Sequence, residues 1–149
     1  MRLLLISDEE DRYLWDFYRP GCLDGFDIIL SAGDLKAEYL SFLVTLSNLP
    51  LLYVHGNHDV RYDQAPPEGC ECIDDRLVTV KGLRILGLGD DTDLAHRGFE
   101  AFLPLLDRWH PAVMVHGHVH RSYRPSVPRV LQYGETRIVN ASGKYYLDL

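Results

Sequence analysis

Four short runs of apolar residues recur along the chain, and polar residues follow each of them at once. The runs predict strands at residues 2–7, 27–32, 51–55 and 112–115. They are continuous instead of alternating, which is typical of strands that are buried on both faces. Ligands in layered α/β folds collect at the carboxyl ends of such strands, so the polar residues that follow the runs are expected to lie near one another.

Two longer segments, residues 36–47 and 99–109, have apolar residues at helical spacing and predict helices. In the second segment, Pro104 must lie in the first turn or break the helix. An aromatic stretch at residues 13–18 predicts a third, short helix, which the proline and glycine that follow it would stop.

The rest of the chain predicts a loop and a series of short strands. Residues 60–72 contain Pro and Gly and predict a surface loop. Further strands are expected at residues 73–74, 77–80, 83–88, 127–132, 136–139 and 145–147. Early alternation of strands and helices, followed by short strands, predicts an α/β (α+β) fold. We expect a four-layer αββα sandwich of two mixed sheets flanked by helices, with residues 1–149 as a single domain.

Composition argues against two classes of partner, membranes and polymeric nucleic acid. The longest apolar run is far shorter than the roughly 20 residues of a membrane span, and residues 1–2 pass directly into a strand without a secretory apolar region. We therefore expect a cytoplasmic protein without a membrane association. The formal net charge is −7 and the 15 basic residues form no run, so polymeric nucleic acid is not an expected partner.

Three cysteines, an odd number, predict free thiols. Cys70 and Cys72 could instead clip a metal ion, although two thiolates one residue apart do not fill a tetrahedral site. His55 is expected to be an interior histidine whose hydrogen bonds are satisfied.

The polar residues that follow the strands form four short motifs. In chain order they are Asp8-Glu9-Glu10, Gly33-Asp34, Gly56-Asn57-His58-Asp59 and Gly117-His118-Val119-His120. Each motif alone is weak, because a Gly-Asp pair is most often a turn and two histidines at this spacing also occur on ordinary surfaces. Their order closely resembles that of the calcineurin-like metallophosphoesterase family, whose blocks run Asp-x-His, Gly-Asp, Gly-Asn-His-(Asp/Glu) and Gly-His-x-His. The resemblance covers essentially the whole chain.

The resemblance implies a dinuclear metal centre in which the carboxylate of Asp34 bridges two divalent ions. The ligands that it implies for one ion are Asp8, Glu10 and His120, and those for the other are Asn57 and His118. Two cations about 3.5–4 Å apart clamp a phosphoryl group and lower the pKa of a water between them. Imidazole together with carboxylate suits Mn, Fe, Zn, Co or Ni better than Ca.

The activity implied is hydrolysis of a small phosphate ester, a diester in preference to a monoester, by attack of a bridging hydroxide. His58 would then face the phosphate and protonate the leaving oxygen, and Asp59 would orient His58. A homo-oligomer could cover the surface around a shallow site. The alternative function, from another class, is a metallophosphoesterase fold with reduced catalysis that serves as a binding or scaffold protein.

Two departures from the family pattern bear on the metals. Position 10 is Glu where the family more commonly has His, which makes that site harder and favours Mn or Mg over Zn. Relatives usually carry a further His ligand ahead of the last motif, and here that segment is missing. His96 lies in the right interval, with a position at the start of a helix as its alternative role. His116 could also contribute, or could pack near the ligands without binding metal.

Overall fold

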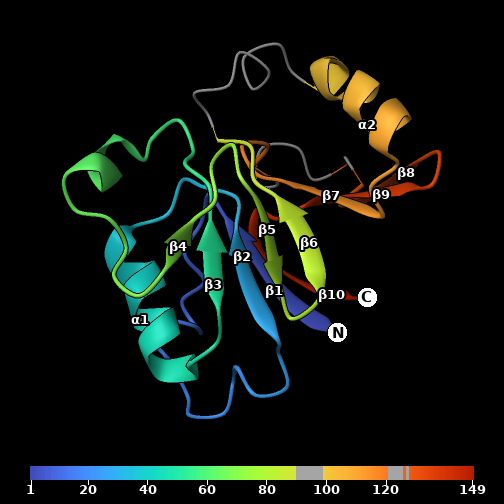
Figure 1. The fold of residues 1–149 in the computed structure, drawn as a ribbon. Coiled ribbons are helices and arrows are strands. Elements are labelled where there is room, and N and C mark those ends of the chain that lie inside the picture. The colour runs from blue at the N-terminus through green and yellow to red at the C-terminus, as the bar shows by residue number, and fades with distance from the viewer. Residues whose placement is uncertain (90–98, 121–125, 127) are drawn as a thin grey trace.

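A computed structural model describes residues 1–89, 99–120, 126 and 128–149. Its largest sheet has five strands in the order β10-β1-β2-β3-β4 (Figure 1). The strands are β1 (Arg2–Ser7), β2 (Ile28–Ser31), β3 (Leu51–Tyr53), β4 (Glu71–Cys72) and β10 (Gly143–Asp148). Strands β1 to β4 are parallel, and β10 pairs with β1 in the antiparallel direction, with Arg2 opposite Asp148. Strands β1, β2 and β3 therefore end at the same edge of the sheet.

Both faces of this sheet are covered by apolar side chains. On one face, Leu4 and Ile6 of β1 pack with helix α1 (Ala37–Ser47), whose Tyr39, Leu40 and Leu43 are buried. On the other face lie Leu3 and Leu5, with residues of the remaining strands. The alternation along β1 thus places the sheet between two core layers, which explains why its residues 3–6 are all apolar.

The second half of the chain forms two smaller sheets. A hairpin joins β5 (Leu77–Val80) to β6 (Leu83–Leu86), and a three-stranded sheet has the order β7-β9-β8. Its strands are β7 (Val113–His116), β8 (Val130–Tyr133) and β9 (Thr136–Asn140). β7 is parallel and β8 antiparallel to β9, so this sheet is mixed. The predicted mixed α/β fold is confirmed, and in the described part of the chain the second half forms two separate sheets where one was predicted.

The 3₁₀ helix η3 (Phe99–Phe102) continues into helix α2 (Leu103–Trp109), and Pro104 occupies its first turn. The hydroxyl of Tyr133 donates to Asp107 over 3.0 Å, which attaches α2 to β8 (Figure 1). Both predicted longer helices are therefore present. Neither described helix has the length and apolarity that a membrane crossing requires.

The predicted short helix at residues 13–18 is wrong, because this segment consists of turns. Its backbone hydrogen bonds do not follow the four-residue spacing of an α-helix, because the N–H of Phe17 donates to the carbonyl of Arg12, five residues back. Trp15 and Tyr18 instead pack on Phe42 of α1, with ring centroids 5.3 and 5.6 Å apart. A segment this short is marginal as a helix, so side-chain packing decides its path.

The predicted loop at residues 60–72 also contains regular structure. It begins with the 3₁₀ helix η1 (Val60–Asp63) and ends in β4, while residues 73–74 are not a strand. Tyr62 of η1 is buried, and its hydroxyl donates to the carbonyl of Leu35. Burial of this aromatic ring fixes the start of the segment against the core.

Candidate metal centre

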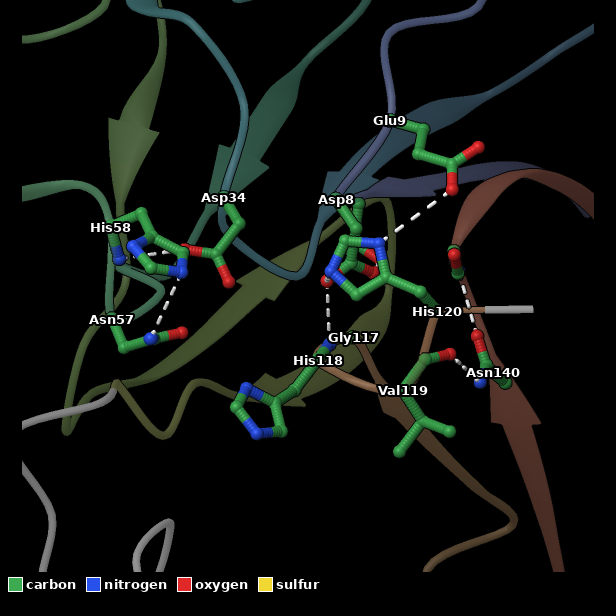
Figure 2. A network of polar contacts seen from close by, with 12 residues as sticks. Asp8, Glu9, Asp34, Asn57, His58, Gly117, His118, Val119, His120 and Asn140 are labelled. Atoms are coloured by element: carbon green, nitrogen blue, oxygen red, sulfur yellow. Dashed lines mark hydrogen bonds and ion pairs between the residues drawn. The ribbon is translucent and has the colours of Figure 1, made fainter. Parts of the chain in front are cut away.

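Three glycines allow the loops after the strands to approach one another. A Cβ on Gly33 would lie 2.5 Å from the backbone nitrogen of Gly56, so the loops after β2 and β3 touch through their backbones. A Cβ on Gly117 would lie 2.8 Å from the carbonyl of Ala32 and 2.9 Å from Oγ of Ser7. These contacts bring the loop after β7 against the ends of β1 and β2. Figure 2 shows the side chains that meet there.

The backbone of three predicted ligands is left-handed. Asp8, Asp34 and His118 have φ values of 63°, 59° and 66°. Residues other than Gly rarely adopt this backbone conformation, which costs roughly 1–2 kcal/mol per residue. Four residues outside this group, Asn48, Asp75, Lys81 and His110, share the left-handed conformation.

The carboxylate of Asp8 lies at the centre of the group. Its side chain is fully buried, and it accepts hydrogen bonds from Oγ of Ser7 (2.6 Å) and from the backbone N–H of His118 (2.8 Å). Nε2 of His120 lies 3.8 Å from Oδ1 of Asp8, and Nδ1 of His120 lies 3.6 Å from a carboxylate oxygen of Glu9. The structure therefore brings the side chain of His120 and the backbone N–H of His118 to the carboxylate of Asp8.

Asp34 connects this group to the loop after β3. Its Oδ1 accepts a hydrogen bond of 2.8 Å from the backbone N–H of His58, and Figure 2 shows its carboxylate between Asp8 and the Asn57-His58 pair. Nδ2 of Asn57 lies 3.2 Å from Nε2 of His58, and both side chains are exposed. An exposed imidazole beside the partly buried carboxylate of Asp34 can meet a ligand from solvent.

Asp59 has contacts that the sequence did not predict. Its side chain is buried, and Oδ2 accepts hydrogen bonds from the backbone N–H groups of Asp34 (2.7 Å) and Gly56 (2.9 Å). These bonds join the loops after β2 and β3, a role that differs from orientation of the His58 ring. Burial raises the pKa of the Asp59 carboxyl, and the two backbone N–H groups oppose that rise.

Two substitutions at Asp59 separate the effect of its hydrogen bonds from the effect of its charge. Asp59→Ala removes the acceptor for two backbone N–H groups and is expected to lower the free energy of unfolding by about 1–3 kcal/mol. Asp59→Asn retains an acceptor oxygen and removes a buried charge, so we expect a smaller loss. Urea unfolding of both variants measures the difference. Equal losses would contradict the account of Asp59 as a link between the loops.

Several predicted residues lie apart from these contacts. A carboxylate oxygen of Glu10 pairs with Nζ of Lys36 at 3.0 Å, and Glu9 is the acidic neighbour that approaches His120. Nδ1 of His116 lies 2.9 Å from the carbonyl of Gly117. His96, the other candidate for an additional ligand, lies outside the described residues.

Asn140 is a residue of the site that the motifs did not indicate. It is buried at the end of β9, and its Nδ2 donates to the carbonyl of Val119 over 2.8 Å (Figure 2). Its Oδ1 accepts from the backbone N–H of Ser142. Asn140 thereby holds the loop between His118 and His120. Its place after an apolar run was the one available sequence signal.

The donor set fits divalent metal ions. Carboxylates, one amide and two imidazoles follow the ends of β1 to β3 and β7, and these are ligand types of Mn, Fe and Zn. Among the described residues of this centre, no three carboxylate or imidazole ligand atoms lie within 4.8 Å of one another, so ion binding would require their side chains to move together. In the described contacts, Asp8 and His120 are the pair closest to a shared ion, and Glu10 would have to leave Lys36 to join them.

Fold and site together place the protein in the class of mixed α/β proteins with the metallophosphoesterase fold. The model of the calcineurin-like phosphoesterase superfamily domain matches residues 1–143, and the chain belongs to that superfamily. The resemblance seen in the four motifs is therefore confirmed. A search of curated proteins found no match.

Solved structures support the same fold. Vacuolar protein sorting 29 from Cryptosporidium parvum is 18% identical with a TM-score of 0.62, and the alignment covers 95% of this chain and 74% of that one. A predicted phosphoesterase from Streptococcus pneumoniae is 16% identical with a TM-score of 0.59, covering 99% and 83%. Vps29 from Entamoeba histolytica in complex with Zn²⁺ is 16% identical with a TM-score of 0.56, covering 96% and 74%.

Proposed function

We propose that the protein is a metal-dependent phosphoester hydrolase that acts on a small phosphodiester. The observation that carries this proposal is the meeting of the loops after β1, β2 and β7 at the buried carboxylate of Asp8, which accepts the backbone N–H of His118 and lies 3.8 Å from Nε2 of His120. Left-handed backbone at Asp8, Asp34 and His118 accompanies this meeting, although turns elsewhere in the chain share that conformation. Membership of the superfamily supports the same reaction class.

Different side chains would bind the metal ions and transfer the proton in this reaction. Two divalent ions, when bound, would supply Lewis acidity and a water of lowered pKa. Asp8, Glu10 and His120 would hold one of them, Asn57 and His118 the other, and Asp34 both. Exposed His58, whose backbone N–H is fixed by Asp34, would face the ester and give a proton to the leaving oxygen.

The charge of the site favours a diester over a monoester. Asp8, Asp34 and Glu9 gather negative charge at the strand ends, and the chain has a net charge of −7. With two divalent ions bound, the carboxylates of Asp8, Glu10 and Asp34 would reduce the charge of the centre to about +1. That charge balances the one negative charge of a phosphodiester near neutral pH better than the nearly two of a monoester. Comparison of matched aryl diesters and monoesters tests this preference.

Activity is expected to depend on added metal. The second ion would have Asp34, Asn57 and His118 as its ligands, one of them a neutral amide, so it should be held more weakly than the first. After chelation, Mn²⁺ is added back while bound metal and the rate of nitrophenyl phosphodiester hydrolysis are followed together. We expect one tightly bound ion and a rate that rises only as a second, weaker ion binds. A rate that is unchanged by chelation would contradict the proposal.

A binding role is the second candidate, and one surface favours it. Leu77 and Leu86 face each other across the β5-β6 hairpin and are 63% and 54% exposed. An exposed apolar pair of this kind suits contact with another protein. If purified protein neither binds transition metal nor hydrolyses the diester, while Leu77→Glu abolishes binding of a partner, the binding role is favoured over the enzyme.

A further inference from the structure

A second group of metal-ligating side chains lies at the ends of β3 and β4. His55 follows β3, Cys72 ends β4, and Asp74 follows two residues later. Their ligand atoms all lie within 4.8 Å of one another, and among the residues that the structure describes this is the one group of three His, Cys, Asp or Glu side chains with that geometry. None of the three belongs to the four motifs.

The contacts within the group converge on a single nitrogen. Nδ1 of His55 lies 2.5 Å from Oδ2 of Asp74 and 3.7 Å from Sγ of Cys72. A Cys-His-Asp catalytic triad needs the thiol on one ring nitrogen and the carboxylate on the other. Here both approach the same nitrogen, so the group does not have the geometry of that triad, and its three ligand atoms are close enough to share an ion.

The carboxylate is also held in place for this purpose. Oδ1 of Asp74 accepts a hydrogen bond of 3.1 Å from the backbone N–H of His55, so Oδ2 remains directed at the imidazole ring of His55. Gly89 packs against this carboxylate, since a Cβ there would lie 2.5 Å from its Cγ. Tyr62 packs on the ring of His55, with their centroids 5.4 Å apart.

The distances suit a tetrahedral ion after a small shift. Bond lengths of 2.0–2.3 Å to Zn²⁺ place nitrogen, oxygen and sulfur ligands about 3.5 Å apart, close to the 3.7 Å between His55 and Cys72. The shorter His55–Asp74 distance is that of a hydrogen bond, whose proton the ion would replace while the pair opens by about 1 Å. Both side chains are over a quarter exposed, which leaves room for this movement.

We propose that His55, Cys72 and Asp74 form a mononuclear site for Zn²⁺ or a similar borderline divalent ion, separate from the candidate dinuclear centre. A thiolate, a carboxylate and a neutral imidazole together carry two negative charges and balance the ion, and water would complete the shell. One thiolate among the three ligands favours Zn²⁺ or Co²⁺ over Mn²⁺ or Mg²⁺. The ion would tie the loop that carries Asn57 and His58 to β4.

Co²⁺ provides the test, because a cobalt–thiolate bond gives a strong near-ultraviolet absorption that carboxylate and imidazole ligands do not give. In the unmodified chain we expect this absorption to reach the intensity of one cobalt–thiolate bond per chain at saturating Co²⁺. Cys72→Ser should abolish it, and Asp74→Asn should weaken Co²⁺ binding about tenfold or more. Cys70→Ser is the matched control and should retain it, because Sγ of Cys70 contacts the carbonyl of Glu68 instead. Absence of the band, or a band that survives Cys72→Ser, would overturn the proposal.

Two further measurements make the result independent of variant folding and of the enzymatic proposal. In the unmodified chain, Zn²⁺ should slow alkylation of Cys72, measured by mass spectrometry, relative to Cys22 and Cys70. Equal rates with and without Zn²⁺ would reject the site. In Asp34→Asn protein the thiolate absorption should persist, since Asp34 is not a member of the group. Loss of hydrolysis with retention of the band would therefore separate the two sites.

Discussion

Asp34→Asn is expected to lower hydrolysis of a nitrophenyl phosphodiester about a thousandfold or more, since removal of a shared ligand forfeits several kcal/mol of transition-state stabilisation. The charge on Asp34 would serve both ions, whereas other ligands serve one. The structure predicts little damage to the fold, because an Asn oxygen can still accept the N–H of His58. Initial rates at saturating Mn²⁺, with bound metal measured on the same samples, give the comparison.

Asp148→Asn is the matched control for this experiment. It makes the same chemical change on β10, where the Asp148 side chain is 80% exposed. Its rate should equal that of the unmodified protein. Near-normal hydrolysis by Asp34→Asn would remove the dinuclear site from the reaction.

Gly33→Ala is expected to lower the free energy of unfolding by about 3 kcal/mol or more, because two costs combine at this position. Gly33 has φ +87°, where a side chain is strained, and an added Cβ would lie 2.5 Å from the backbone nitrogen of Gly56. The loops after β2 and β3 would have to separate. Denaturant unfolding measures the stability, and metal binding should weaken in parallel because Asp34 and Asn57 lie on these loops.

Gly25→Ala separates the two costs. Gly25 has a similar φ of +81°, but no atom lies within 4 Å of an added Cβ. The control should therefore lose only the backbone cost, roughly 1–2 kcal/mol, and should retain metal binding. Equal losses in the two variants would show that the close approach of the loops contributes nothing.

Much of the fold that positions the site was accessible from local pattern. The continuous apolar runs located β1, β2, β3 and β7, and helical spacing located α1 and α2. These predictions succeed because burial on both faces leaves a strong local signature. The position of the motifs after those runs then predicted that Asp8, Asp34 and His118 approach one another.

The remaining features depend on partners distant in sequence. Residues 13–18 follow the packing of Trp15 on Phe42, which no helical spacing reveals. Asp59 was expected to serve His58, yet its buried oxygen accepts backbone N–H groups from two loops. His55 meets Cys72 and Asp74 across 17 and 19 residues, without a recognisable motif. Such contacts are set by tertiary packing and leave no periodic trace.

The pairing of β1 with β10 has a consequence for how the protein folds. Strand β1 lies inside the sheet, yet its antiparallel neighbour joins Arg2 to Asp148, nearly the whole chain apart. Bringing such distant segments together costs loop-closure entropy before the contacts repay it, so folding should be slow compared with that of a helical protein of this length. During synthesis on the ribosome, one edge of β1 would have no hydrogen-bonded neighbouring strand until Gly143–Asp148 has been synthesised. Asp8, at the end of that strand, would then acquire its final surroundings among the last events of folding.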